Sequence, residues 1–467
     1  MPRWSPFNKP ICQVIGDDLL VLKKVAEGWY VDYKVSAPTK GYSKYLSSFA
    51  NQYGGYLFLG ILEDPQEPLM AGTFPGIPMS ELQIQLQKIR QGVTPPQVSH
   101  PYHFEPRVIE GPVASIGLPA DRCIVIVEVE EGPSPPYICS NGCVYRRIGD
   151  SSEPEPEKDR SGMQALLEKA NVVKESLKQF VLAPVEENQG SERPSRTCYL
   201  YLLSDLSLKP RSHELTFAEF REALDSDQFP GSSVPVGAQF PAPGGYVAQQ
   251  LNRDSKPSDN IYSIRWWHNG NVCARMPVRI ISDDDPYDEL NDSSFARFRK
   301  LLSEVDPDLS DHTVIDLGVW LCLLIPSVMH CLRLRDMAGI TGTYWMKIAF
   351  LLGKHDIPFA PMELFVNQVA GSGVPFVQDS RIIVPSGFDT PDAYFEIEDN
   401  DKSLSLHDRA VYALLMPIIG CFQVLGVDMD IFSKAQDWPA AIIPGLMNAI
   451  SAGCRAAEVA SRRHDEG

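Results

Sequence analysis

The order of apolar and polar positions in the first 150 residues predicts alternating helices and strands. Amphipathic or helix-favouring segments lie at residues 17–26, 42–53 and 79–92. Segments rich in β-branched and aromatic residues predict strands at 29–35, 56–62 and 123–129, and the continuously apolar 123–129 is typical of a central strand. An Asn-Gly pair between segments 136–139 and 144–148 indicates a hairpin. This order predicts an α/β module with a mixed sheet, covering residues 1–150.

The remaining chain divides into a linker region, 151–196, and a second domain, 197–467. The linker region begins with a Pro/Glu/Ser-rich stretch and contains a predicted helix at about 161–181. In the second domain we predict a strand at 199–203, a capped helix at 216–224 and a hairpin formed by 262–267 and 272–279. Beyond residue 283 the pattern is mainly helical, with helices at 292–302, 314–332, 406–425 and 440–462 and weak strands at 343–350 and 381–384. The sequence therefore predicts a mainly helical α+β second domain.

Composition places limits on function. A chain of 467 residues suits two or three domains. Its net charge of −18 argues against a simple basic nucleic-acid binder, although residues 1–150 carry 13 Lys/Arg against 15 Asp/Glu and leave room for a local basic surface. The ten cysteines are scattered and the first residues lack an apolar leader segment, which predicts free thiols in a reducing, cytoplasmic setting. The apolar segments 317–329 and 410–425 are predicted to be buried core helices, because the first is shorter than the ~20 residues of a membrane span and Pro417 and Gly420 interrupt the second.

The segment 49–57 is predicted to turn a helix into a strand. Gly54 and Gly55 permit positive φ and close backbone approach, and Asn51 precedes them at the end of the helix. The segment lacks the G-x-x-x-x-G-K-[ST] pattern of a phosphate-binding loop, and so does the glycine-rich stretch at 371–373. Nothing in the sequence therefore supports ATP hydrolysis.

Four acidic residues of the first module could converge at one end of its sheet, namely Glu27, Asp32, Glu63 and Asp64. Clustered carboxylates hold Mg²⁺ or Mn²⁺, and such a metal can support phosphodiester cleavage. Lys34 lies on the same strand face as Asp32 and suits a phosphate contact. On spacing alone, ordinary surface acids near loops are the favoured interpretation.

Other candidates have equally simple alternatives. Arg147 could face nucleic acid at a hairpin edge, or could pair with an acid such as Glu128. Lys40 and Lys44 could bind phosphate near a helix N-terminus, although solvated lysines are commoner. Tyr42 and Tyr45 could stack on bases or pack in the core. Zinc binding, with Cys139 and Cys143 beside His100 and His103, is a minority interpretation.

The ordered set of motifs resembles the Schlafen/AlbA-type domain over about residues 15–150. The set begins with Glu27 followed by Asp32-Tyr33-Lys34, and continues with Ser-x-Phe-Ala-Asn-x-x-Gly-Gly-x-Leu at 47–57. Gly60, Glu63, Asp64 and Gly72 come next. The last elements are Pro95-Pro96, the strand 124–129, Pro135-Pro136-Tyr137 and Tyr145-x-Arg147-x-Gly149. Phe-Ala-Asn-x-x-Gly-Gly is the specific part. The rest of the chain resembles no family that we can name.

The resemblance implies a metal-dependent nuclease, since Schlafen-like nucleases cut structured RNA, notably tRNA, with three acids and a divalent metal. By motif, Glu27 and Asp32 match the first two acids and Asp64 the third, with Glu63 as its alternative. The family more often has Glu where this chain has Asp32, and the shorter side chain withdraws a ligand oxygen by one methylene. The leading hypothesis is thus an Mg²⁺- or Mn²⁺-dependent endoribonuclease in phage defence or stress response.

Two alternatives remain open, a nucleic-acid-binding regulator without catalysis and a protein-interaction scaffold. The acidic, apolar-helix-rich second domain suits dimerisation or partner binding better than RNA contact. A two-lobed RNA clamp of the kind formed by larger Schlafen proteins would require a homodimer here, formed through the C-terminal helices.

Overall fold

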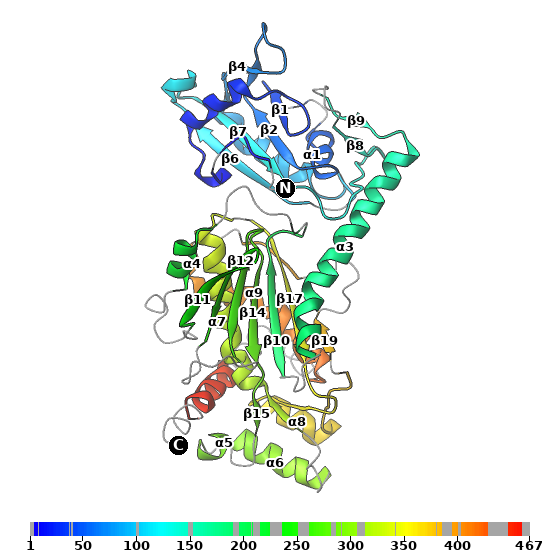
Figure 1. Cartoon of the computed structure of the whole chain (residues 1–467), viewed down its shortest axis with the longest axis vertical. Helices are drawn as coiled ribbons and strands as arrows, with labels where there is room; N and C mark the ends of the chain where they lie inside the picture. Colours follow the sequence, from blue (N-terminus) through cyan, green and yellow to red (C-terminus); the bar gives the residue numbers. More distant parts are fainter. Residues whose placement is uncertain are drawn as a thin grey trace.

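A computed structural model describes most of the chain (Figure 1). The described residues are 4–7, 9–36, 38, 41–99, 102–147, 153–189, 196–206, 208, 215–224, 236–250, 261–281, 286–290, 292–305, 313–340, 342–379, 381–384, 395–399, 403–427 and 447–459. Two sheets, each with helices packed against it, lie at opposite ends of a long helix, α3 (Figure 1).

The N-terminal sheet is mixed, as the sequence predicts. Its strands are β1 (Val31–Lys34), β2 (Gly55–Leu59), β7 (Arg122–Val129), β5 (Ile77–Pro78) and β6 (Phe104–Glu110). β1 runs parallel to β2, whereas β7 is antiparallel to β2, β5 and β6. β6 contains Pro106 and no sequence pattern had indicated it. The mixed α/β character of this part of the chain is confirmed.

Residues on alternate positions of β2 and β7 enter two separate cores. Leu57, Leu59, Val125 and Val127 pack with α1 (Ser43–Ala50) and α2 (Leu82–Gly92), whereas Tyr56, Phe58, Ile124 and Ile126 pack with the N-terminal 3₁₀ helices. Asp32 is in register with Leu57 and Lys34 with Leu59. The site residues of β1 therefore belong to the face that α1 covers.

Shorter elements complete this part. They are η1 (Ile11–Gln13), η2 (Gly16–Lys24), η3 (Met79–Glu81), η4 (Ala114–Ile116), β3 (Leu62–Glu63), β4 (Ala71–Thr73), β8 (Tyr145–Arg146) and β9 (Glu155–Pro156). The helix predicted at 17–26 is the 3₁₀ helix η2. The predicted Asn-Gly hairpin forms a turn with one bridge, Ile138 to Val144, and β8 pairs with β9 instead of with the preceding segment.

The long helix α3 (Arg160–Gln189) contacts both sheets' domains. Lys169, on its first half, lies 2.8 Å from the Glu131 carboxylate and donates to the main-chain oxygens of Asn51 and Gln52. On its second half, Leu177 and Val181 pack against the C-terminal sheet, and Tyr201 Oη donates to Val181 O at 2.9 Å. The segment predicted as a linker helix thus has specific contacts at both ends.

The C-terminal part is built on an antiparallel sheet of eight strands. They are β10 (Thr197–Leu203), β11 (Ala238–Ala242), β12 (Gly245–Gln249), β13 (Ser263–Trp267), β14 (Val272–Pro277), β17 (Tyr344–Leu351), β19 (Arg381–Val384) and β20 (Phe395–Ile397). A small sheet contains β15 (Ile280–Ile281), β16 (Val314–Asp316) and β18 (Ile357–Phe359). The prediction of a mainly helical domain is therefore not confirmed. The sequence did not indicate strands such as β11, β12 and β20, because they have too few residues to show a clear period-two pattern.

Helices cover this sheet on both faces. The central strand β10 shows the division, since Leu200 and Leu202 enter the core with α7 and α9, and Tyr199 and Tyr201 face α3. The other C-terminal helices are α4 (Phe217–Ala223), α5 (Pro286–Glu289), α6 (Ser293–Val305), α7 (Leu317–Met337), α8 (Glu363–Ser372) and α9 (Leu406–Val424), with a further helix at 447–459. The start of the helix predicted at 440–462 lies outside the described residues.

Helix α7 lies close to the predicted helix 314–332 and contains the apolar segment 317–329. Among the described helices it alone has the length and apolar composition to cross a membrane, and 83% of its most apolar stretch is buried inside the protein. That burial agrees with the predicted core helix. Cys322 of α7 forms a disulfide with Cys454, so the prediction that the thiols are all free is wrong at this pair. The two cysteines are 132 residues apart, and no spacing pattern links them.

Candidate functional site

Glu27 and Asp32, the first two acids of the motif, are buried side by side at β1. Glu27 lies between η2 and β1, where its main-chain N–H donates to Leu69 O at 2.8 Å. Asp32 is on β1 itself. Their side chains are 4% and 0% exposed, so both carboxylates lie in a region of low dielectric constant.

Asp32 is held by two cations. Arg147 Nη1 donates to Asp32 Oδ2 at 2.7 Å, and Lys34 Nζ lies 2.6 Å from Oδ1. Burial lowers the pKa of Lys34, but the charge and hydrogen bond of Asp32, together with the charges of Glu27 and Glu153, outweigh burial and raise the pKa overall. Arg147 thus pairs with an acid, although the sequence had suggested Glu128, which binds Tyr56 Oη at 2.8 Å.

The Arg147 guanidinium also has contacts that do not involve Asp32. It donates to the main-chain oxygens of Gly28 and Val31, and it lies over the Phe49 ring at 4.7 Å. Its side chain is 1% exposed. Arg147 therefore closes the acid centre from within and cannot reach a surface ligand in this arrangement.

Glu27 has a different environment. Its Oε1 accepts the main-chain N–H of Tyr33, whereas its Oε2 is buried without a hydrogen-bond partner among the described residues. Burial, followed by the negative charge of Asp32, raises the pKa of Glu27 to about 8. Glu27 is therefore mostly protonated at neutral pH.

The structure does not bring Asp64 to this pair. Asp64 Oδ1 accepts the N–H of Gln66 in its own turn, at 2.8 Å. Of Glu63 and Asp64, Glu63 is the acid that influences Glu27. Its negative charge contributes to the raised pKa of Glu27, and its Oε2 accepts the N–H of Leu69 at 3.3 Å. Leu69 thus joins Glu27 and Glu63 through its two main-chain groups.

The arrangement does not fit the predicted Mg²⁺ or Mn²⁺ site. Across the described part of the chain, no three His, Cys, Asp or Glu side chains are placed to hold a metal ion. Asp32 has both oxygens beside cations, and Glu27 contributes one unpartnered oxygen. The described residues do not form the zinc site considered as an alternative either. Cys139 Sγ lies 3.2 Å from Ser47 Oγ, and His103 packs against Gly342. His100 lies outside the described residues.

Beside this centre, lysine and tyrosine side chains gather at the rim. Lys44 lies 5.4 Å from the Tyr45 ring and 5.8 Å from the Tyr145 ring, and Lys34 lies 5.1 Å from the Tyr45 ring. We call Lys34, Lys44, Tyr45 and Tyr145 the lysine–tyrosine cluster; all four side chains are half-buried. Lys40 lies outside the described residues, and Tyr42 is a core residue, as expected.

Glu153 closes the lysine–tyrosine cluster. Its carboxylate lies 2.7 Å from Lys44 Nζ and 3.5 Å from Lys34 Nζ, and it accepts Tyr45 Oη at 3.1 Å. Burial would raise the pKa of Glu153, but the hydrogen bond from Lys44 and the charge of Lys34 outweigh it and lower the pKa. Sequence reasoning missed Glu153, because it lies in a Pro/Glu/Ser stretch that looks like a linker.

Asn51 and the two glycines build the junction that positions these groups. Asn51 Oδ1 accepts the N–H of Tyr137 at 2.7 Å, and Nδ2 donates to Tyr145 O at 2.9 Å. Gly54 has φ of +73°, and a Cβ there would meet Val129 O at 2.7 Å. The predicted structural role of this junction agrees with these contacts.

A mixed sheet, a glycine-rich helix-to-strand junction and a buried carboxylate–arginine centre define the N-terminal part as an α/β domain with a closed acid centre. Residues 27–156 match the family model described as Schlafen, AlbA_2. The match does not extend into the C-terminal part. It does extend past residue 150, so it includes Glu153 and β9.

Other comparisons add little. No curated protein matches the chain. Among solved structures, the chain is similar to the DIP2311 protein from Corynebacterium diphtheriae, with 16% identity and a TM-score of 0.18. That alignment covers 28% of this chain and 22% of the other, so the chain spans about a fifth of the length of that relative. The family match suggests a function related to nucleic acid.

Proposed function

We propose that the N-terminal domain binds single-stranded nucleic acid through the lysine–tyrosine cluster and acts without cutting it. The observation that carries the proposal is the arrangement of two ammonium groups over two half-buried tyrosine rings. Lysines neutralise phosphates, and aromatic rings stack on unpaired bases. The family's link to nucleic acid supports the same reading.

The state of the acid centre supports binding without cleavage. Asp32 is neutralised by Arg147 and Lys34, Glu27 holds a proton at neutral pH, and Asp64 is turned into its own loop. Ionised, convergent carboxylates with free oxygens favour a divalent cation, and among the described residues this centre offers only the unpartnered oxygen of Glu27. The acid centre is better suited to a structural role than to binding a divalent cation. It holds β1 and the chain segment that contains Arg147 together, beneath the lysine–tyrosine cluster.

Binding can be measured by fluorescence anisotropy with the full chain and a labelled single-stranded RNA at several salt concentrations. Lys44→Gln should weaken binding and flatten the salt dependence by about 0.7 in the log–log slope, the value for one phosphate contact on a single strand. Lys88→Gln is the matched control, because Lys88 is exposed on α2 and forms no ion pair with a described residue. Equal effects of the two substitutions would reject the cluster as the binding surface.

Metal-dependent RNA cleavage remains the second candidate, favoured by one observation. Glu27 Oε2 is buried beside Asp32 without a partner, as an oxygen awaiting a ligand would be. Incubation of the protein with tRNA or single-stranded DNA, in Mn²⁺ or in EDTA, separates the two functions. Products that need Mn²⁺ and vanish in both Glu27→Ala and Asp32→Ala would establish the nuclease and refute binding without cleavage.

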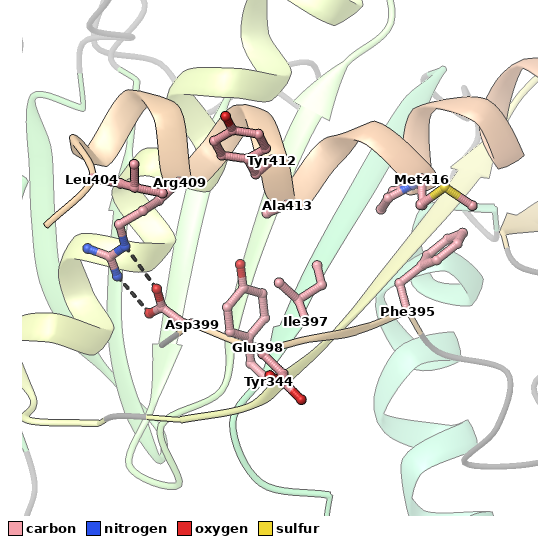
Figure 2. A pocket seen from close by; sticks show the side chains of 11 residues that line it. Tyr344, Phe395, Ile397, Glu398, Asp399, Leu404, Arg409, Tyr412, Ala413 and Met416 are labelled. Atoms are coloured by element: carbon pink, nitrogen blue, oxygen red, sulfur yellow. Dashed lines mark hydrogen bonds and ion pairs between the residues drawn. The ribbon is translucent and has the colours of Figure 1, made fainter. Parts of the chain in front are cut away.

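The C-terminal part has a surface that suits a second copy of this chain. A pocket of about 500 Å³ opens between α9 and β20 and is bounded by the Arg409–Asp399 ion pair (Figure 2). At its rim, Tyr412 is 64% exposed and Met416 is 56% exposed, one helical turn apart on α9. Large apolar side chains grouped on a surface are typical of protein contacts. We therefore extend the proposal to a homodimer formed through α9.

Sedimentation equilibrium tests the homodimer. The double substitution of Tyr412 and Met416 by Ser should shift a dimer to monomer, whereas Val172→Ser should not. Val172 is a fair control because it is 66% exposed but lies on α3, away from the pocket. A wild-type protein that is monomeric at high concentration would refute the dimer.

A further inference from the structure

The lysine–tyrosine cluster already contains an anion supplied by the chain itself. The two Glu153 oxygens accept from Lys44 Nζ and Tyr45 Oη, and Lys34 Nζ lies 3.5 Å away. These are the donors that a phosphate group would use, since a phosphate also presents several oxygen acceptors and negative charge. Glu153 therefore stands where a backbone phosphate of a bound strand would lie.

Charge balance shows what Glu153 controls. Arg147 and Asp32 neutralise one another inside the domain, at 2.7 Å. Lys34 is shared between Asp32 and Glu153, and Lys44 pairs with Glu153. With Glu153 in place the cluster has a net charge of +1, and without Glu153 it has a net charge of +2.

The segment that carries Glu153 is fixed just beyond it. β9 pairs with β8, the main-chain N–H of Glu157 donates to Val144 O at 2.8 Å, and Arg146 Nε lies 2.9 Å from Glu157 Oε2. The Glu153 side chain precedes these contacts and is 49% exposed. It can leave the cluster by rotation without breaking the β8–β9 pairing.

We propose that Glu153 is a built-in competitor that occupies the phosphate position of the lysine–tyrosine cluster and is displaced when nucleic acid binds. This inference rests on the proposed binding function and adds a means of regulation. Ligands with one weak anionic contact do not displace Glu153, whereas a strand that also stacks on Tyr45 or Tyr145 does. The cluster is thereby selective for polyanions with unpaired bases.

The test compares the full-chain protein with Glu153→Gln and Glu155→Gln by anisotropy on labelled single-stranded RNA. Glu155 is the matched control, because it is exposed two residues away and its side chain has no hydrogen bond or ion pair with a described residue. Glu153→Gln should tighten binding about fivefold, the size expected for removing half-exposed ion pairs. Glu155→Gln should change binding less than about twofold at physiological salt, where exposed charges are screened.

A double-mutant cycle locates the effect. In the Lys44→Gln background, the gain from Glu153→Gln should shrink, because one of the two groups that Glu153 blocks is already absent. Equal gains for Glu153→Gln and Glu155→Gln, with wild-type binding intact, would overturn the competitor role and leave the binding function standing. Absence of binding by wild type and every variant would instead overturn the binding function itself.

Discussion

The protonated state of Glu27 predicts a pH-dependent stability that a single substitution should remove. Glu27→Gln keeps the shape of the side chain and an oxygen able to accept the N–H of Tyr33. Its amide group would lie where Oε2 now lies without a partner, near the Asp32 carboxylate. The variant is therefore neutral at every pH and has a donor for a buried acceptor.

The size of the effect follows from the two pKa values. In the unfolded chain Glu27 should titrate near 4.5, whereas in the folded protein its pKa is about 8. Between these pH values the folded state keeps a proton that the unfolded state has lost. The stability contributed by this proton is thus complete at low pH and falls as pH rises, by at most about 1.4 kcal/mol per pH unit. From pH 5 to 7.5 the loss approaches about 3 kcal/mol.

Urea unfolding of the wild type and Glu27→Gln at pH 5, 6, 7 and 8 measures this loss. Other groups titrate as well, so the quantity to compare is the difference in unfolding free energy between the two proteins. It should grow in favour of Glu27→Gln by about 3 kcal/mol over this range. Glu67→Gln is the control, because Glu67 is exposed in the turn between β3 and β4.

A flat difference for Glu27→Gln would refute the reasoning. It would mean that Glu27 is ionised in the folded protein at neutral pH, despite its burial and the neighbouring Asp32. Two adjacent buried carboxylates would then be charged together and would need a cation beyond Lys34 and Arg147. The acid centre would return to the metal-dependent interpretation.

Three further substitutions test the framework around the site. Arg147→Ala should lower the unfolding free energy by about 3–5 kcal/mol, because it leaves Asp32 buried with one partner fewer, and Asp32→Asn in the same chain should recover part of that loss in urea unfolding. Asn51→Ala should cost about 2–3 kcal/mol, because the Tyr137 N–H and the main-chain oxygens of Tyr137 and Tyr145 lose their partner; protection of the Tyr137 amide from hydrogen exchange should fall as well. Cys454→Ser should lower the unfolding midpoint by an amount corresponding to about 2–4 kcal/mol, and a reducing agent should produce the same shift in the wild type and none in the variant.

Local patterns in the sequence were sufficient for most of the N-terminal sheet. β2 is apolar throughout and β7 is apolar from Cys123 to Val127, and the helices α1 and α2 are followed by glycine or proline residues that end them. β6 was not predicted, because Pro106 interrupts it and because its side chains are mostly half-buried, so apolar and polar residues do not alternate clearly along it. In the C-terminal sheet, strands were predicted at the positions of β10, β13, β14, β17 and β19, whereas the short strands β11, β12 and β20 were not predicted.

Local sequence patterns could not predict which side chains pair with one another inside the site. Asp32 and Arg147 are 115 residues apart, and nothing in either segment states that they meet. The choice between Asp64 and Glu63 depends on how the β3–β4 turn folds back, because the turn decides which carboxylate faces Leu69 and Glu27. Glu153 could not be predicted as a site residue without knowing that β9 pairs with β8, because this pairing places the segment predicted as a linker beside Lys44.

The Arg147 guanidinium has partners on both sides of the acid centre. It donates to Asp32 Oδ2 at 2.7 Å and lies over the Phe49 ring at 4.7 Å. Moving Arg147 out of the centre would leave two main-chain acceptors without a partner as well as the Asp32 charge, because Arg147 also donates to the main-chain oxygens of Gly28 and Val31. Buried acceptors without partners cost about 1–3 kcal/mol each. The closed centre is thus supported by contacts independent of Asp32, and a ligand for the acids would have to replace them all.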